Sequence, residues 1–189
     1  MSEDQYLTGQ FLIAMPAMDD PNFDRTVTYV CEHNDEGALG IVINRPIDMS
    51  LGEILAQMDL EIPDPALAEQ RVLQGGPVQP ERGFVIHDDG SAAGFSATLD
   101  VQDGIKVTTS RDILEALAKG SGPQHAVIAL GYAGWGAGQL EAEMAANSWL
   151  TVPATPDIIF SVPFERRWEA AARLIGIDIT ALSSEAGHA

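Results

Sequence analysis

The fold is decided by residues 125–150, which read HAVIALGYAGWGAGQLEAEMAANSWL. Residues 125–130 are mostly apolar, and a short apolar run bounded by turn residues predicts a buried strand. Glycines then recur up to position 138, and glycine permits backbone angles and close approaches that other residues do not. We therefore predict a strand over 125–130, a tightly shaped glycine loop over 131–138 and a helix that begins at Gln139.

The glycine loop has two interpretations. In the first, its backbone N–H groups form a nest for an anion at the N-terminus of the following helix. Glu141 and Glu143 oppose this interpretation because they already neutralise the positive end of that helix. In the second, which we favour, the glycines make room for Trp135 and let the helix pack closely on the sheet. Trp135 and Gln139 remain candidates to line a pocket at this strand end.

Apolar and polar residues alternate along much of the remaining chain, which is typical of strands with one buried face. In residues 26–33, for example, one face carries Val27, Tyr29, Cys31 and His33, and the other carries Thr26, Thr28 and Glu32. The expected strands are residues 10–14, 26–33, 38–44, 71–73, 83–87, 97–101 and 105–107, with two further proline-bounded apolar segments at 149–152 and 158–160.

Further helices are predicted from their start signals. Ser50 with Glu53, and Thr109 with Asp112, have the spacing of a capping box, in which two side chains satisfy the first backbone N–H groups. Apolar residues recur at helical spacing over 164–175, and the glycine that follows is typical of a helix end. These patterns add three helices to the one at Gln139.

At 189 residues the chain has the length of one domain, and we expect a single domain over 1–189. Its single cysteine rules out an internal disulfide and fits a reducing compartment. Residues 1–4 lack the basic and apolar parts of a signal peptide, and the apolar runs are too short to cross a membrane. We therefore expect a cytoplasmic protein with no membrane partner.

The formal net charge is −18, from 10 Lys and Arg against 28 Asp and Glu. DNA affinity depends largely on basic residues that replace counterions at phosphates. The basic residues here are scattered, apart from Arg166, Arg167 and Arg173. Direct nucleic-acid binding is therefore disfavoured, and a protein partner with a basic surface or a small-molecule ligand is expected. The alternative is that the charge serves solubility alone.

Several polar residues stand at predicted strand ends, where functional loops usually gather. His33, Asn44 and His87 could form the site of an enzyme acting on a small molecule, because histidine is a general base near neutral pH. No catalytic triad, paired-carboxylate, cofactor or metal-ligand spacing accompanies them, so we predict no catalytic residue, cofactor or metal. The candidate ligand-binding residues are His33, Asn44, Arg45, Gly75, Gly76, His87, Trp135 and Gln139.

Cys31 also has two interpretations. It stands two residues from His33 on a predicted strand, so the two side chains would share a face and could form a thiol–imidazole pair. Cys31 also lies on the apolar face, where a lone cysteine usually packs as an inert hydrophobic residue. We favour the second interpretation.

Ordered motifs extend along nearly the whole chain. They are Gly9, residues 12–16 and 20–23, His33, residues 37–40, 44–46 and 75–78, His87, residues 131–141, Glu143, Asn147, Trp149 and residues 187–189. In this order the motifs resemble the YqgE/AlgH family of bacterial proteins.

The resemblance implies more about fold than about chemistry. It implies an α+β domain whose bifurcated, mostly antiparallel sheet curls into a pseudo-barrel, and we expect about four helices packed outside. Some members are described as transcriptional regulators, and the family offers no established catalytic residues to carry over. We therefore favour a regulator or adaptor that acts through a protein partner or small ligand, and keep the small-molecule enzyme as the alternative.

Overall fold

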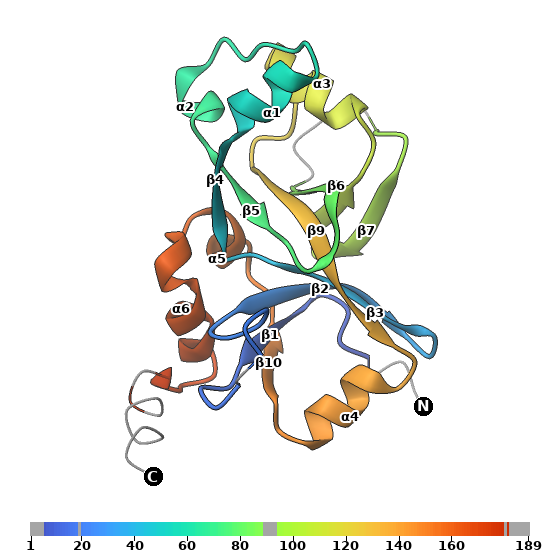
Figure 1. Ribbon diagram of the computed structural model, residues 1–189, viewed down its shortest axis with the longest axis vertical. Helices are drawn as coiled ribbons and strands as arrows, with labels where there is room; N and C mark the ends of the chain where they lie inside the picture. The colour runs from blue at the N-terminus through green and yellow to red at the C-terminus, as the bar shows by residue number, and fades with distance from the viewer. Residues whose placement is uncertain (1–5, 19, 89–93, 180, 182–189) are drawn as a thin grey trace.

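The computed structural model describes residues 6–18, 20–88, 94–179 and 181. Its strands form one curled sheet that makes a half-barrel (Figure 1). Nearly all strand pairs are antiparallel, in the order β10-β1-β2-β3-β9-β6-β8-β7, with β4 and β5 off this path. The strands are β1 Gln10–Ala14, β2 Val27–Asn34, β3 Gly37–Val42, β4 Pro46–Ser50, β5 Arg71–Gln74, β6 Val78–His87, β7 Thr98–Gln102, β8 Ile105–Thr108, β9 Ala126–Gly136 and β10 Trp149–Pro153.

The sheet divides along β9, the long strand that runs diagonally through Figure 1. Residues 133–136 at one end of β9 pair with β3. Residues 126–130 at the other end pair with β6 on one side and, through residues 129–130, with β5 in parallel on the other. The predicted bifurcated α+β sheet is therefore confirmed, and β9 is the strand that both branches share.

Four of the described helices have seven residues or more, which matches the predicted number. The α1 and α3 helices lie over one branch of the sheet, α4 lies at the other end of β9, and α6 lies beside β1 and β2 (Figure 1). The helices are α1 Leu51–Gln57, α2 Pro65–Ala68, α3 Asp112–Lys119, α4 Gln139–Ala145, α5 Pro156–Phe160 and α6 Arg167–Arg173, with a 3-10 turn, η2, at Phe164–Arg166.

Apolar side chains pack in three clusters that follow from this arrangement. The largest includes residues from both branches of the sheet, such as Tyr29 and Phe84, together with Trp168 from α6. A second lies beneath α1 and α3, and a third lies beneath α4 around Leu140. Trp168 is buried and donates its indole N–H to the carbonyl of Ala14 at 2.9 Å, so it is a core residue as predicted.

The predicted loop over 131–138 is wrong, because β9 continues as a strand to Gly136. The glycines serve strand packing. A Cβ atom on Gly131 would lie 2.5 Å from the carbonyl oxygen of Gly76, closer than real atoms approach. The helix does begin at Gln139, and Gly138 before it has the positive φ of 75° that glycine adopts easily. An anion nest in a loop therefore finds no support in this geometry.

Two other predictions of local structure are wrong. Thr109 does not cap α3. Asp112 instead accepts hydrogen bonds from Ser110 and Ser96, which ties the helix start to the segment before β7. The apolar segment 158–160 is helical because Pro156 at the first position and Thr155 at the N-cap favour a helix start. By contrast, the capping box of Ser50 and Glu53 is present at α1 as predicted.

Candidate functional site

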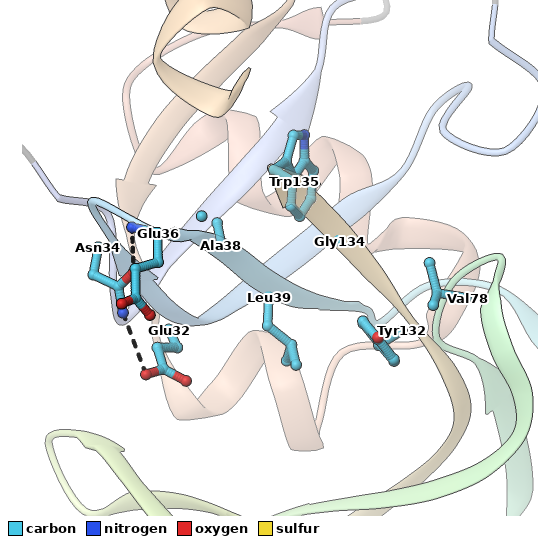
Figure 2. A pocket seen from close by; sticks show the side chains of 10 residues that line it. Glu32, Asn34, Glu36, Ala38, Leu39, Val78, Tyr132, Gly134 and Trp135 are labelled. Carbon is cyan, nitrogen blue, oxygen red and sulfur yellow. Dashed lines mark hydrogen bonds between the residues drawn. The ribbon is translucent and has the colours of Figure 1, made fainter. Parts of the chain in front are cut away.

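A pocket of about 490 Å³ opens where the β2–β3 hairpin meets the end of β9 (Figure 2). Figure 2 shows two kinds of lining side chain: Glu32, Asn34 and Glu36 stand together at the hairpin, and Leu39, Tyr132 and Val78 stand further along. Its lining residues are Glu32, Asn34, Glu36, Gly37, Ala38, Leu39, Val78, Tyr132, Gly134 and Trp135. We call this the hairpin pocket.

Backbone pairing holds the hairpin pocket in shape. Asn34 pairs with Gly37 to close the hairpin, and its side chain accepts the backbone N–H of Glu36 at 2.9 Å. Gly37 lies so close to β9 that a Cβ atom there would be 2.3 Å from the carbonyl oxygen of Trp135. The two exposed carboxylates of Glu32 and Glu36 are therefore carried by a fixed turn rather than by a free loop.

A β-bulge in β2 determines which residues face this pocket. Pairing with β3 shifts between Val30 and Glu32, so that Glu32 lies opposite Leu39 and His33 lies opposite Ala38. Directly opposed residues share a face of a sheet. Leu39 packs on the largest apolar cluster, to which Cys31 belongs, whereas Ala38 packs on the cluster beneath α4.

The bulge makes one sequence prediction wrong, because Cys31 and His33 lie on opposite faces of β2. Cys31 is buried, and burial raises the pKa of its thiol well above the ordinary range. A thiolate is the reactive form of cysteine. The structure thus gives no support for a thiol–imidazole pair.

His33 joins β2 to the N-terminal segment and to α4. Its Nδ1 atom accepts the backbone N–H of Leu7 at 2.9 Å, so in the neutral ring the proton resides on Nε2. Nε2 then donates to the Glu141 carboxylate at 2.8 Å. The ring is buried, and Tyr6 contacts it edge-on. His33 is therefore fully engaged in contacts within the chain.

This hydrogen bond predicts a pH dependence of stability. The bond from His33 lowers the pKa of the Glu141 carboxyl below its ordinary value. A carboxyl with a lower pKa in the folded than in the unfolded chain stabilises the fold above the unfolded pKa, and this stabilisation is lost as the pH falls through the folded pKa. We expect Glu141→Gln to be less stable than wild type at about pH 5.5, and the difference to be smaller at about pH 3.

Urea unfolding of both proteins at the two pH values measures this difference. Glu61→Gln, at an exposed position far from His33 in the chain, is the control and should match wild type at both. A loss in Glu141→Gln of the same size at both pH values would contradict the assigned role of the carboxylate.

Glu143, in α4, is the centre of a second cluster of polar side chains. Its Oε1 atom accepts the indole N–H groups of Trp135 at 3.2 Å and Trp149 at 3.0 Å. Its Oε2 atom accepts from the amide of Gln139 at 3.0 Å, and Gln139 in turn accepts the backbone N–H of Gly136. We call Trp135, Gln139, Glu143 and Trp149 the tryptophan clamp.

Trp135 and Gln139, which the sequence made candidates for lining a pocket, belong to the tryptophan clamp. Trp135 is buried against Trp149 and Phe23, with only an edge at the hairpin pocket, and Gln139 is engaged within the clamp. Sequence reasoning treated Glu143 only as a helix charge. The signal that could have identified it was the pair of tryptophans eight residues before and six residues after it.

Comparison with known proteins shows to which family the chain belongs. A family described as AlgH-like matches residues 11–180. The chain belongs to the AlgH-like family. A UPF0301 protein of Ralstonia nicotianae is 58% identical over 97% of this chain and 95% of its own, and one of Thioalkalivibrio sulfidiphilus is 54% identical over all of both.

Solved structures agree with this assignment. The solution structure of the AlgH protein from Pseudomonas aeruginosa is 48% identical, has a TM-score of 0.78 and covers 100% of this chain and 99% of that one. The crystal structure of protein DIP2367 from Corynebacterium diphtheriae has a TM-score of 0.74 at 18% identity, covering 97% and 94%, and shows the shared fold alone. The resemblance predicted from the motifs is confirmed.

In this AlgH-like chain the side chains of Asn44 and Arg45 form hydrogen bonds with the backbone of residues 22–27. Asn44 accepts the N–H of Val27 and donates to the carbonyl of Arg25, both at 2.9 Å. Arg45 donates to the carbonyls of Asn22 and Asp24. Both side chains thus fasten the loop before β2 to the end of β3.

Gly75 and Gly76 lie beside these residues and pass against β9. The carbonyl of Gly75 accepts the N–H of Val42, and its own N–H donates to the carbonyl of Leu130. A Cβ atom on Gly76 would lie 2.1 Å from the backbone carbon of Tyr132. These glycines permit close contact between strands, and their backbone groups are engaged with the sheet.

His87 lies at the opposite end of β9 from His33. It pairs with Ala126, whereas the hairpin that carries His33 meets β9 at Trp135. Nine residues of strand span about 30 Å. His87 donates Nδ1–H to the carbonyl of Asp88, and its Nε2 lies 2.7 Å from the Thr108 hydroxyl. The structure does not bring the two histidines into one site.

Asn44 is also separated from His33, since it binds Val27 at the start of β2 and His33 stands near its end. Six residues of strand span about 20 Å. The enzyme alternative required all three side chains in one cleft. Because they occupy three separate places, that alternative has no geometric support.

The basic residues near the C-terminus do not form a groove in the AlgH-like fold. Arg167 is buried and donates to the carbonyls of Ile43 and Val162 at 2.6 and 2.8 Å. Burial lowers the pKa of its guanidinium to about 10. Arg166 and Arg173 are exposed. Arg167, the middle residue of the three basic residues noted in the sequence, is therefore buried in the core and not available at the surface.

Among the described residues, no group of three or more His, Cys, Asp or Glu side chains is arranged to hold a metal ion. No helix there is long and apolar enough to cross a membrane.

Proposed function

We propose that this AlgH-like protein is a non-enzymatic adaptor that binds a basic segment of a partner protein. The hairpin pocket receives an arginine or lysine side chain from that segment. Glu32 and Glu36 pair with its charge, and the Tyr132 ring and Leu39 contact its aliphatic stem. A role in transcription would then operate through the partner rather than through DNA.

The observation that carries this proposal is the composition of the hairpin pocket. It combines two exposed carboxylates with an aromatic ring and apolar side chains on one concave surface. Arginine and lysine have the matching form, with a charged head on an apolar stem.

A second acidic hollow is a poorer match to a basic side chain than the hairpin pocket. It lies between α1 and α3 and is lined by Asp59, Glu61 and Glu115, but also by Lys119. No aromatic side chain is among its lining residues. A basic side chain would meet a like charge there and no ring, so the hairpin pocket is the better match.

The overall charge favours the same class of partner. A net charge of −18 attracts a basic surface over a distance and raises its rate of association. The same charge repels the phosphates of nucleic acid, and the burial of Arg167 removes one of the few cations that could oppose this repulsion. The partner is therefore expected to be a protein.

The proposal is tested with a fluorescein-labelled hexa-arginine peptide, whose binding is followed by fluorescence anisotropy. The double variant Glu32→Gln/Glu36→Gln is expected to bind about tenfold more weakly, since each exposed ion pair contributes up to about 1 kcal/mol. The matched control Glu61→Gln/Glu69→Gln removes the same net charge from exposed positions outside the pocket. It should weaken binding by less than about threefold.

Equal losses in the two double variants would show that the peptide responds to total charge only, and would reject the hairpin pocket as the site. A Tyr132→Ala variant adds a second measurement. It should also weaken peptide binding while leaving the net charge unchanged.

A further inference from the structure

A hollow separate from the hairpin pocket lies between the sheet and the helices α1 and α3. Its volume is about 280 Å³. Ile54 and Met58 line it from α1 and the residue after that helix, Leu114 lines it from α3, and Ile128 and Leu130 line it from β9. None of the candidate residues from the sequence analysis lines it. We call it the helix-side hollow.

An exposed glycine of β6 lines the helix-side hollow and leaves space open on the sheet side. Gly83 lies opposite Leu130 in the antiparallel ladder, and Val85, two residues on, is buried beneath α1 and α3. Residues two apart share a face of a strand. A side chain at position 83 would therefore point toward the helices. A Cβ atom there meets nothing within 4 Å.

The lining indicates the class of ligand. The floor and walls are mainly apolar, which favours an apolar body. At the rim, Arg111 and Glu81 carry opposite charges, and Arg111 is already bonded to the carbonyl of Met58 and paired with Glu115. The rim therefore favours neither an anion nor a cation. Thr109, which also lines the hollow, can offer its hydroxyl group to a neutral ligand. The Ser110 hydroxyl already donates to Asp112 and accepts the backbone N–H of Ala97.

The volume limits the size of the ligand. A cavity of about 150 Å³ is large enough for benzene, so 280 Å³ accepts a molecule about the size of a fused bicyclic ring. An α-helix is about 10–12 Å across with its side chains and does not fit. A small molecule is therefore a better match than a peptide.

We propose that the helix-side hollow is a binding site for a small, uncharged, mainly apolar molecule that carries one hydrogen-bonding group. The apolar body lies over Gly83 between Ile54 and Leu130. The polar group faces the Thr109 hydroxyl at the rim. This site lies on the other branch of the sheet from the hairpin pocket, so it is independent of the basic-segment function.

Titration with indole, followed by ¹H–¹³C NMR of methyl groups, tests the proposal. Indole has one N–H donor on an uncharged bicyclic ring. In wild-type protein we expect saturable shifts at the methyl groups of Ile54, Met58 and Leu130. In Gly83→Val the added side chain occupies the hollow, so indole affinity should fall by about tenfold or more. Valine is favoured in strands, and this variant should melt at or above the wild-type temperature.

Two further variants make the result decisive. Ile54→Phe reduces the hollow from the helix side and should also weaken indole binding, which covers the case that Gly83→Val fails to fold. Gly134→Ala adds a methyl group at the hairpin pocket and should leave indole binding unchanged. Absence of saturable shifts in wild type, or unchanged affinity in a folded Gly83→Val protein, would overturn the proposal.

Discussion

Glu143→Ala is expected to lower the free energy of unfolding by about 3 kcal/mol. The Glu143 carboxylate accepts two indole N–H groups and one amide N–H, and both indoles belong to buried side chains. Each buried donor left without an acceptor costs about 1–3 kcal/mol. The loss is larger than for a typical surface glutamate because one side chain serves Trp135, Trp149 and Gln139 together.

Chemical denaturation with tryptophan fluorescence measures this loss, and Glu61→Ala at an exposed position is the matched control. Glu143→Gln should fall between the two. Its amide oxygen can still accept both indole N–H groups, whereas its amide nitrogen would face the N–H donor of Gln139. A Glu143→Ala protein as stable as the Glu61→Ala control would contradict the assigned role of the tryptophan clamp.

Gly76→Ala is expected to lower the free energy of unfolding by about 3 kcal/mol or more, because no side chain fits at this position. The new Cβ atom would lie 2.1 Å from the carbonyl carbon of Tyr132 and 2.2 Å from its oxygen. Both atoms belong to the backbone of β9, which cannot move alone because β3 and β6 pair with it. The connection between β5 and β6 would have to separate from the sheet.

Gly83→Ala is the matched control, since it adds the same methyl group to β6 with nothing within 4 Å. Thermal unfolding of both variants by circular dichroism makes the comparison. We expect a clear fall in melting temperature for Gly76→Ala and little change for Gly83→Ala. Similar melting temperatures for the two variants would show that β9 is not fixed by this contact.

The elements with clear local signals were predictable from the sequence. Residues 10–14 are mostly apolar, are bounded by Gly9 and Pro16, and form β1 over that range. Ser50 and Glu53 start α1 through the predicted capping box. The turn at 103–104 joins β7 to β8 as expected. For the helix start and the turn, the deciding contacts are made within a few residues, so the local pattern is sufficient. For β1, the apolar run predicts a buried strand but not its pairing with β10.

The glycines of β9 show where local patterns fail. Glycine between other residues usually predicts a loop, yet Gly131 and Gly134 lie within a long strand. The reason is tertiary, because Gly131 faces the carbonyl of Gly76, which stands 55 residues earlier in the chain. Nothing within the segment 131–138 shows that another strand will press against it.

The candidate site was predictable only in part. His33 was identified as a residue of interest, but its partner Glu141 stands 108 residues away in the sequence. The bulge that turns His33 away from Cys31 adds a single residue to β2 and interrupts the alternation without a sequence signal of its own. Hairpin-pocket residues such as Glu32 and Tyr132 become neighbours only when β3 pairs with β9.

The central claim is that the hairpin pocket holds a basic side chain, and mapping the bound peptide by ¹H–¹⁵N NMR tests it most directly. On titration with hexa-arginine, the largest backbone amide shifts should occur in residues 32–39 of the hairpin and 132–136 of β9. Shifts spread evenly over the acidic surface, or concentrated around Asp59 and Glu61 in the second acidic hollow, would contradict the claim.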